Sequence, residues 1–208
     1  GPDRLPHIVP MEGHTPLDDA LARIDAANAE DPNTELVDGT PQPKELVYAQ
    51  RMSASLERLR PDAPETLRIA VRGQHLRRWD VPRDSYPRDR IGYLKWRKGL
   101  YKYHAEQTAA CMRAAGYDEE AIARVQFLIE KKRLGDDPDT QTLEDCACLT
   151  FLQHHFAEFS GRTDREKMVG ILRKTWKKMS PQAQQAALSL ELPEGAQALL
   201  EEALHGGE

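Results

Sequence analysis

Cysteine, aromatic residues and long apolar runs are all scarce in this sequence of 208 residues. The three cysteines, Cys111, Cys146 and Cys148, are too few for a disulfide framework and indicate a reducing, cytoplasmic location. Because Cys146 and Cys148 would face different sides of a helix, we expect buried, unreactive thiols there rather than a metal clamp. No apolar run approaches the length of a membrane span. Glycine-rich phosphate loops, nucleophile elbows and spaced Cys/His zinc motifs are also missing.

The remaining composition is that of a folded helical domain. Charged residues make up 30% and apolar residues 39% of the chain, and its length suits one hydrophobic core. We therefore predict an all-α fold, a compact multi-helix bundle in a single domain over residues 16–205. Residues 1–15 are expected to be a disordered segment or a tag remnant, and residues 206–208 a frayed tail.

Prolines and capping residues divide the chain into expected helices. Apolar residues at helical spacing predict helices over about residues 16–30, 43–59, 64–79, 89–115, 118–133 and 137–160. A further helix follows a capping box at Thr163 and Glu166, and Pro181 and Pro193 open two short ones. Asp38 and Gly39 mark a turn, and no stretch alternates in the manner of a strand.

Four of these helices carry a polar residue on a face that otherwise points to the core. Glu45 and Asp145 each begin an apolar stripe, while His75 and His104 lie within one. Buried polar groups need partners, and His with carboxylates is the donor set that helical proteins use for zinc, manganese or iron. The four residues would form one metal site if they converge. Alternatively, Glu45 complements a helix end and each His bonds a carbonyl group.

The segment from Arg68 to Lys102 is strongly basic, with eleven Lys or Arg and three Asp or Glu, although the net charge of the chain is −5. Aromatic residues alternate with the cations, as in sites that hold a phosphate or carboxylate while a ring stacks nearby. We expect a small anionic or phosphorylated ligand rather than nucleic acid. The alternative is a solvated, salt-bridged face. The candidate ligand-binding residues are Gln74, Arg77, Arg78, Trp79, Arg88, Arg90, Tyr93, Lys95, Trp96, Arg97 and, further along the chain, Lys131.

Several segments together resemble an uncharacterised family, catalogued as domain of unknown function 4202. The resemblance extends over about residues 17–200 and depends on Gln74–Trp79, Ser85–Arg90, Gly92–Arg97, Gln141–Asp145 and Lys174–Ser180. This family implies no established activity.

More distantly, the helix order is similar to that of the HD-domain metal-dependent phosphohydrolases. In this resemblance Glu45 replaces the first His of that superfamily, and His104 and Asp145 match its later His and Asp. Gln74 and His75 stand at its His-Asp pair, or a shift of one residue puts Leu76 at the Asp position. The intact His-Asp pair is therefore lost. If hydrolysis survives, the resemblance implies a metal-bound hydroxide, charge neutralisation by Arg77, Arg78 or Lys131, and proton transfer by Glu144 or Glu106.

Two functions follow as hypotheses. The first is a degenerate HD-like hydrolase that acts on a phosphorylated small molecule or nucleotide, with a divalent metal. The second is a non-catalytic module that senses an anionic metabolite or binds a partner protein. Oxygenase chemistry at an iron site is a third, although the ligand count is short for it.

Overall fold

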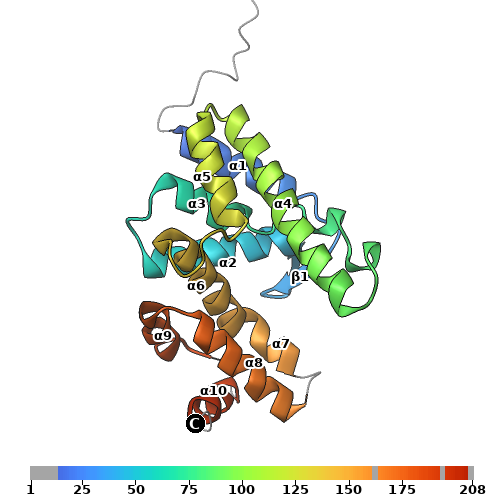
Figure 1. The fold of residues 1–208 in the computed structure, drawn as a ribbon, viewed down its shortest axis with the longest axis vertical. Helices are drawn as coiled ribbons and strands as arrows, with labels where there is room; N and C mark the ends of the chain where they lie inside the picture. The colour runs from blue at the N-terminus through green and yellow to red at the C-terminus, as the bar shows by residue number, and fades with distance from the viewer. Residues whose placement is uncertain (1–13, 161–163, 193–194, 206–208) are drawn as a thin grey trace, which may run out of the picture. The chain divides into compact units, whose positions relative to one another are not determined.

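The structure is a computed structural model that describes residues 14–160, 164–192 and 195–205 (Figure 1). The expected N-terminal segment therefore lies almost wholly outside the described residues, as do the expected tail, Thr163 and Pro193. The chain divides into two compact units, each described here by itself. The first unit comprises Gly1–Ala49 and Pro64–Glu130, and the second Gln50–Ala63 and Lys131–Glu208. The expected single domain stays a prediction.

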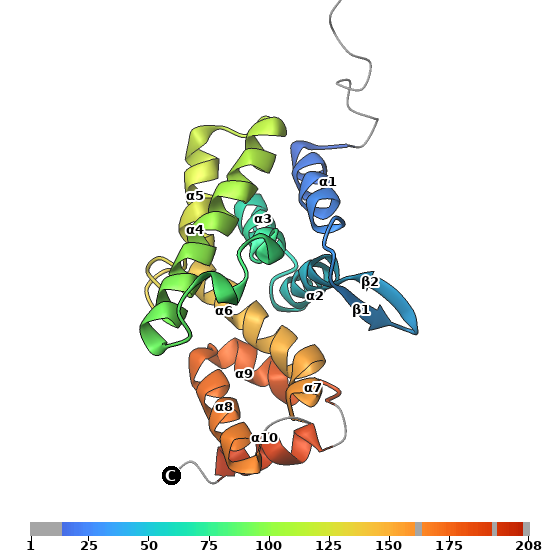
Figure 2. The same ribbon diagram turned by 90° about the vertical axis from the view of Figure 1, so that its right-hand side faces the viewer.

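The first unit is built mainly from four helices. α4 and α5 lie side by side, and both pack on α3, while α1 packs on α3 and α4 (Figures 1 and 2). The bounds are α1 Pro16–Asn28, α3 Glu65–Gly73, α4 Arg90–Ala114 and α5 Glu119–Ile129. The main α-helical prediction is thus confirmed.

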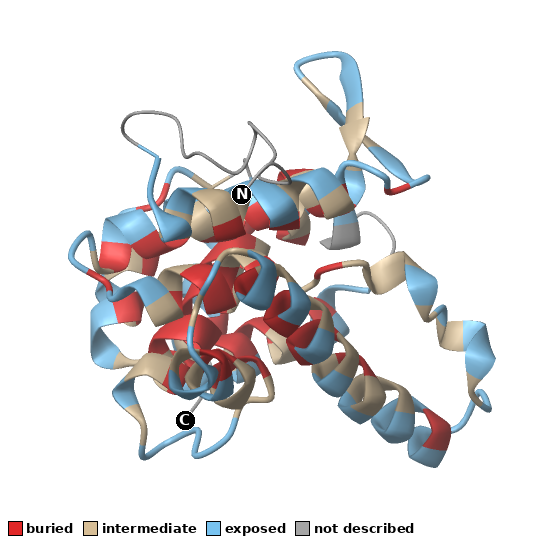
Figure 3. Ribbon diagram, turned by 90° about the horizontal axis from the view of Figure 1, so that it is seen from above, coloured by how far each residue is buried: buried red, intermediate tan, exposed pale blue. Residues whose placement is uncertain are grey.

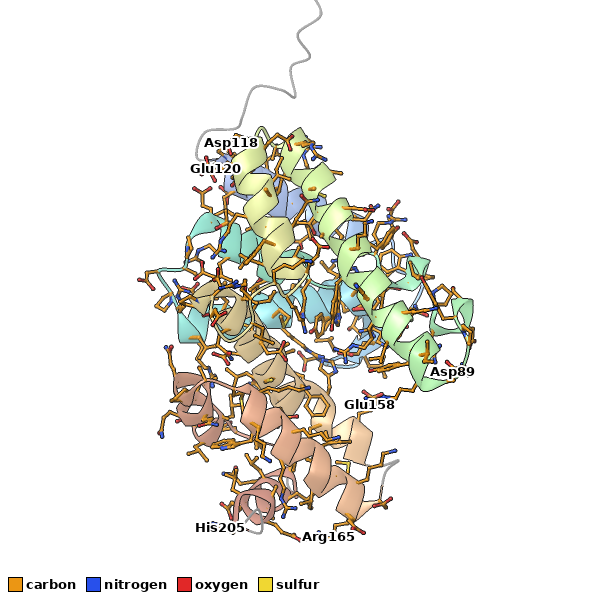
Figure 4. The ribbon with its side chains drawn as sticks, viewed as in Figure 1. Asp89, Asp118, Glu120, Glu158, Arg165 and His205 are labelled. Carbon is orange, nitrogen blue, oxygen red and sulfur yellow. The ribbon has the colours of Figure 1, made fainter. Side chains whose placement is uncertain are left out.

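Side-chain caps start three of these helices, α1, α4 and α5, close to where the sequence indicated. Thr15 and Asp18 form a capping box at α1, and Asp118 accepts a hydrogen bond from the Ala121 amide at α5. Asp89 accepts one from the Gly92 amide at the first turn of α4. Figure 4 labels Asp89 and Asp118 at the ends of the two helices that they begin. These caps satisfy amide groups that have no partner within the helix.

A β-hairpin before α2 was not predicted. β1, Thr34–Val37, pairs antiparallel with β2, Thr40–Pro43, around the expected turn at Asp38 and Gly39. Figure 2 shows the hairpin as a two-stranded ribbon that leads into α2, Lys44–Leu59. Its residues are exposed or half-buried (Figure 3). Strands of four residues are too short to show an alternating pattern, so the prediction of no strand was wrong here.

The chain leaves helical geometry earlier than expected after α3. The prediction extended this helix to Trp79, but it ends at Gly73 and turns follow. Arg77 then adopts a left-handed conformation, with φ 57° and ψ 36°, before the short 3-10 helix η2, Arg78–Asp80. A second 3-10 helix, η3, Arg83–Ser85, lies in the expected loop before α4. Likewise, α5 was expected to extend to residue 133 but ends at Ile129. Lys131 therefore lies outside the helix, contrary to the prediction.

The second unit takes the end of α2 and the helices from residue 138 onward. α6, Pro138–Thr150, continues through a π-helical segment, Phe151–His155, into α7, Phe156–Ser160. α6 packs on α8 and α9, and α8 packs on α10. The bounds of these three are α8 Arg165–Lys178, α9 Pro181–Leu188 and α10 Ala196–His205. Asp164, rather than the expected Thr163, caps α8 through the Lys167 amide.

Buried residues lie on the helix sides that face neighbouring helices within each unit (Figure 3). The core of the first unit includes Ile24, Leu67, Ile69, Met112 and Leu128, all 0% exposed. No helix in the described part of the chain is long and apolar enough to cross a membrane. Cys146 and Cys148 are buried as expected, whereas Cys111 is half-buried. Burial raises the pKa of the Cys148 thiol to about 12, so this thiol stays protonated at neutral pH.

Gly92 is required at the start of α4. A Cβ atom at this position would overlap the carbonyl oxygen of Pro87, which is backbone and cannot rotate away. We expect Gly92→Ala to lower the free energy of unfolding by about 1–3 kcal/mol, the usual cost of overpacking. Gly170 in α8 is the control, because nothing lies within 4 Å of its added Cβ. Gly170→Ala should stabilise the protein by about 0.5–1 kcal/mol through helix propensity. Equal urea-unfolding midpoints for the two variants would contradict this packing argument.

Candidate functional site

Polar residues of the first unit gather where the start of α2 and the turn after α3 meet α4. We call Glu45, Tyr48, Gln74, His75 and His104 the histidine cluster. Glu45, Gln74 and His104 are buried, with 7%, 6% and 1% exposure. The Tyr48 hydroxyl donates to Gln74 Oε1 at 3.0 Å, and the backbone amide of Glu45 donates to Asp31 Oδ2 at 2.8 Å. Three of the four predicted metal ligands, Glu45, His75 and His104, are neighbours in this cluster.

His104 is the most buried member of this cluster. Its Nδ1 lies 2.8 Å from the carbonyl oxygen of Leu76. A carbonyl oxygen can only accept, so Nδ1 carries the proton and Nε2 presents a lone pair when the ring is neutral. Burial, and then the neighbouring His75, lower the pKa of His104 to about 3. His104 is therefore a neutral hydrogen-bond acceptor at physiological pH.

His75 lies between a carboxylate and a guanidinium. Its Nδ1 is 3.5 Å from Glu45 Oε1, and its ring stacks on Tyr48 with 4.0 Å between centroids. The Nη1 atom of Arg78 lies 3.5 and 3.4 Å from its two ring nitrogens. The ring centroid of His104 is 5.8 Å away. His75 thus connects the buried acceptors to the basic loop that follows α3.

Three arginines stack on aromatic rings beside this cluster. Arg78 lies 5.4 Å from the Trp96 ring centroid, Arg83 lies 5.8 Å from Tyr93, and Arg97 lies 5.7 Å from Tyr93. We call these five residues the arginine–aromatic cluster. Trp96 is held in place by a hydrogen bond of 2.9 Å from its Nε1 to the Val81 carbonyl oxygen. Cation–π contacts orient each guanidinium while its edge stays available for hydrogen bonds.

None of these three arginines forms an ion pair with a carboxylate in the parts of the chain that the structure describes. Arg83 donates to the carbonyl oxygens of Tyr86 and Asp89, and Arg97 donates to the Tyr101 hydroxyl. Among the described residues, Arg78 has only the His75 ring as a hydrogen-bond partner. The alternative of a fully salt-bridged basic face therefore does not describe this cluster.

Other arginines of the basic segment do have acidic partners. Arg72 binds Asp25 through two hydrogen bonds of 2.8 and 2.7 Å, and Arg77 pairs with both Glu30 and Asp80. Arg88, a predicted ligand-binding residue, pairs with Asp84 at the surface. For these positions the predicted anion binding is opposed by an existing intramolecular partner.

The turn at Arg77 places Arg78 next to Trp96. The Asn28 side chain accepts a hydrogen bond from the Arg77 amide at 3.2 Å, and the Arg77 side chain is held by Glu30 and Asp80. Asp80 also accepts from the Tyr103 hydroxyl. Although burial raises the pKa of Asp80, its hydrogen bonds from Tyr103 and Arg77 lower it below 3.8, so the carboxylate stays ionised.

The other predicted site residues have separate environments. Trp79 lies under the Arg77 guanidinium, 5.3 Å from it, whereas Arg90, Lys95 and Glu106 are exposed. In the second unit, Lys131 forms an ion pair with the buried Glu144 at 2.9 Å. The proton-transfer roles suggested for Glu144 and Glu106 stay predictions.

Asp145, the fourth predicted metal ligand, belongs to the second unit and has a structural role there. Its carboxylate accepts hydrogen bonds from the Ser180 amide, the Ser180 hydroxyl and Gln141 Nε2, at 2.9, 2.6 and 2.9 Å. Ser180 is the N-cap of α9. Asp145 therefore fastens the start of α9 to α6.

No group of three or more His, Cys, Asp or Glu side chains within residues 14–160, 164–192 and 195–205 is arranged to hold a metal ion. The histidine cluster offers two imidazoles and one carboxylate, but the cation of Arg78 lies against His75. A positive charge at that position opposes a divalent metal. The predicted zinc, manganese or iron site stays a prediction.

Sequence reasoning did not identify Arg83, Tyr48 or Asn28. Arg83 lies in an aperiodic loop, where no pattern shows which way a side chain points. Tyr48 gave a usable signal, because it follows Glu45 by three residues on an apolar stripe and a buried hydroxyl needs a partner. Asn28 gave none, since its partner is the backbone of a turn 49 residues later.

A family model described as Domain of unknown function (DUF4202) matches residues 18–200. The chain belongs to this family, as its segments indicated. Comparison with curated proteins and with solved structures gave no significant match.

Burial of neutral His104 makes stability depend on pH. Unfolded His104 takes up a proton below its ordinary pKa of 6.5, whereas the folded residue resists protonation down to about 3. Between these values the unfolded state binds more protons, so stability is lost as the pH falls. We expect His104 to contribute a decrease of about 1.4 kcal/mol per pH unit to the free energy of unfolding.

The comparison variant is His104→Asn, whose amide can still donate to Leu76 but does not titrate. Urea unfolding from pH 7 to pH 4 should give a shallower pH dependence for this variant than for the wild type. Parallel curves would show that His104 is not buried in neutral form.

Proposed function

We propose that the first unit is a binding module for a small anionic ligand, and that Arg78 in the arginine–aromatic cluster is its anchor. The observation that supports this proposal best is the lack of a carboxylate partner for Arg78, Arg83 and Arg97 among the described residues. An arginine held by rings but not paired with a carboxylate can bind phosphate or carboxylate without first breaking an internal ion pair. We also propose, as the sequence predicted, that the protein acts in the cytoplasm.

Arg78 is the strongest anchor because most of its donors are available. Within the described part of the chain, only its Nη1 atom has a hydrogen-bond partner, the His75 ring. Its Nε and Nη2 atoms, which form the edge used for bidentate bonds, have no partner in the described residues. The ring of Trp96 restricts the guanidinium, which lowers the entropy cost of binding. Arg83 and Arg97 have fewer donors left, so they add positive potential more than direct bonds.

A second candidate, the degenerate HD-like phosphohydrolase, is favoured by one feature. His104 donates from Nδ1 to a backbone carbonyl, the arrangement that orients a metal-ligating or proton-accepting Nε2. Stoichiometric zinc, manganese or iron in protein purified without added metal would support this candidate over the binding module.

Substitution of Arg78 tests the binding proposal. Arg78→Gln removes the charge but keeps a polar side chain, and charge-assisted hydrogen bonds are worth more than neutral ones. We expect the affinity for inorganic phosphate, measured by isothermal titration calorimetry at low salt, to fall by about tenfold or more. Arg113→Gln is the matched control, because Arg113 lies on α4 but pairs with Glu119 at the surface.

The control variant should bind phosphate as the wild type does. Equal affinity of the wild type and Arg78→Gln, or no phosphate binding by the wild type, would contradict the proposal.

A further inference from the structure

The first turns of α4 expose several apolar side chains to solvent. Ile91, Tyr93 and Leu94 are 66%, 41% and 51% exposed, so three large apolar residues lie uncovered within four consecutive positions. Figure 4 labels Asp89, which precedes Ile91 by two residues, at the start of this helix. Single exposed apolar residues are ordinary, whereas neighbouring ones on one element indicate an interaction surface. This part of α4 is therefore a candidate docking surface.

Two of these apolar residues share one face of α4 with three lysines. Helical spacing places the members of this face at i, i+3, i+4, i+7 and i+11, and all of them are exposed: Ile91, Leu94, Lys95, Lys98 and Lys102. We call these five residues the α4 stripe. The stripe is about 17 Å long, since a helix rises about 1.5 Å per residue. Tyr93 lies outside it and contacts Arg83 and Arg97.

The charge of the α4 stripe has one sign and is not compensated by its neighbours. The sequence from Ile91 to Lys102 contains no Asp or Glu. None of the three lysines forms an ion pair with any carboxylate in the part of the chain that the structure describes. Near the other end of α4, by contrast, Arg113 pairs with Glu119. The stripe thus combines an aliphatic end with a row of lysines whose charge only solvent or a partner can balance.

This combination distinguishes among the classes of partner. A helix that lies on a membrane carries apolar residues along its length, whereas here they occupy a single turn. Nucleic acid would present phosphates to the lysines but nothing apolar to Ile91 and Leu94, and the net charge of −5 opposes its binding. An acidic protein segment with apolar side chains of its own complements both ends of the stripe, because interfaces combine an apolar centre with complementary charges.

We propose that the α4 stripe docks an acidic, amphipathic segment of a partner protein. Ile91 and Leu94 form the apolar contact, and the three lysines face the carboxylates of that segment. The flexible lysine side chain suits this role, since it can reach carboxylates at several positions. This proposal goes beyond anion binding at Arg78 and does not depend on it. Lys95, which the sequence assigned to the small anion, is assigned here to the partner.

The test uses a fluorescently labelled synthetic helical peptide in which leucines and glutamates repeat the spacing of the α4 stripe. Its affinity is measured by fluorescence anisotropy at low and at high salt. Lys98→Glu reverses one charge and should weaken binding about fivefold or more at low salt. Ile91→Ser should weaken it by about fivefold or more through the lost apolar contact. High salt should weaken binding to the wild type, because exposed charges are screened.

Two matched controls lie outside the stripe. Lys174→Glu reverses the charge of an exposed lysine of α8, and Leu36→Ser changes an exposed leucine of the hairpin. Both variants should bind the peptide as the wild type does. A peptide with glutamine in place of each glutamate should bind the wild type more weakly, since it keeps the apolar contact but lacks the charge. Circular dichroism verifies that each variant is folded.

Several results would overturn the proposal. These are no binding of the acidic peptide by the wild type, equal losses in Lys98→Glu and Lys174→Glu, or equal losses in Ile91→Ser and Leu36→Ser. Vesicles of anionic phospholipid and a single-stranded RNA oligonucleotide are measured in parallel. If either binds more tightly than the peptide and is weakened by Lys98→Glu, the stripe is a lipid or nucleic-acid surface and the proposed protein partner is wrong.

Discussion

The chain reversal at Arg77 is the constraint on which the candidate site depends. Arg77 is not a glycine, yet it adopts a left-handed conformation that costs about 1 kcal/mol or more. Asn28 holds its amide, and Glu30 and Asp80 hold its side chain. One residue earlier, the Leu76 carbonyl oxygen accepts a hydrogen bond from His104 Nδ1. The same turn therefore fixes the tautomer of His104 and directs Arg78 toward Trp96.

The arginines of the basic segment fall into two groups, those that pair with a carboxylate and those that do not, and the second group defines the candidate site. Acidic residues of α1 and of the following turn pair with Arg72 and Arg77 and stabilise the fold. The cations nearest to α4 are instead held by rings and carbonyl groups. Their charge is compensated only by solvent or by a ligand, because no described carboxylate pairs with them. In the same region the buried His104 stays neutral at physiological pH, because its pKa is lowered to about 3. The first unit therefore contains both unpaired arginines and a neutral imidazole that can accept a hydrogen bond.

Much of the fold was predictable from local chemistry. The starts of α1, α4, α5, α6 and α9 follow directly from Thr15, Asp89, Asp118, Asp137 and Ser180, each a side-chain cap in the structure. The hairpin was missed because its strands have four residues each, with prolines in β2. The end of α3 was misplaced because the apolar spacing continued to His75, whereas the helix ends at Gly73 and turns follow.

The candidate site was predictable only in part. Helical spacing placed Glu45 and His104 on faces that are buried in the structure, whereas His75 is half-buried and lies in the turns after α3. The roles of Arg78 and Trp96 in ligand binding stay predictions. Spacing cannot say which partner a buried group finds. The Asp145 carboxylate accepts a hydrogen bond from Ser180, 35 residues later, and Arg77 donates one to Glu30, 47 residues earlier. Such pairings depend on how helices pack, so the sequence showed the charges but not which of them were already paired.

The most direct measurement is a titration of the protein with inorganic phosphate, followed by nuclear magnetic resonance of the arginine Nε–H groups. The account predicts that the Arg78 signal shifts most, with smaller changes at Arg83 and Arg97 and none at Arg72, which remains bound to Asp25. Saturable shifts confined to arginines outside the arginine–aromatic cluster, with Arg78 unchanged, would contradict it.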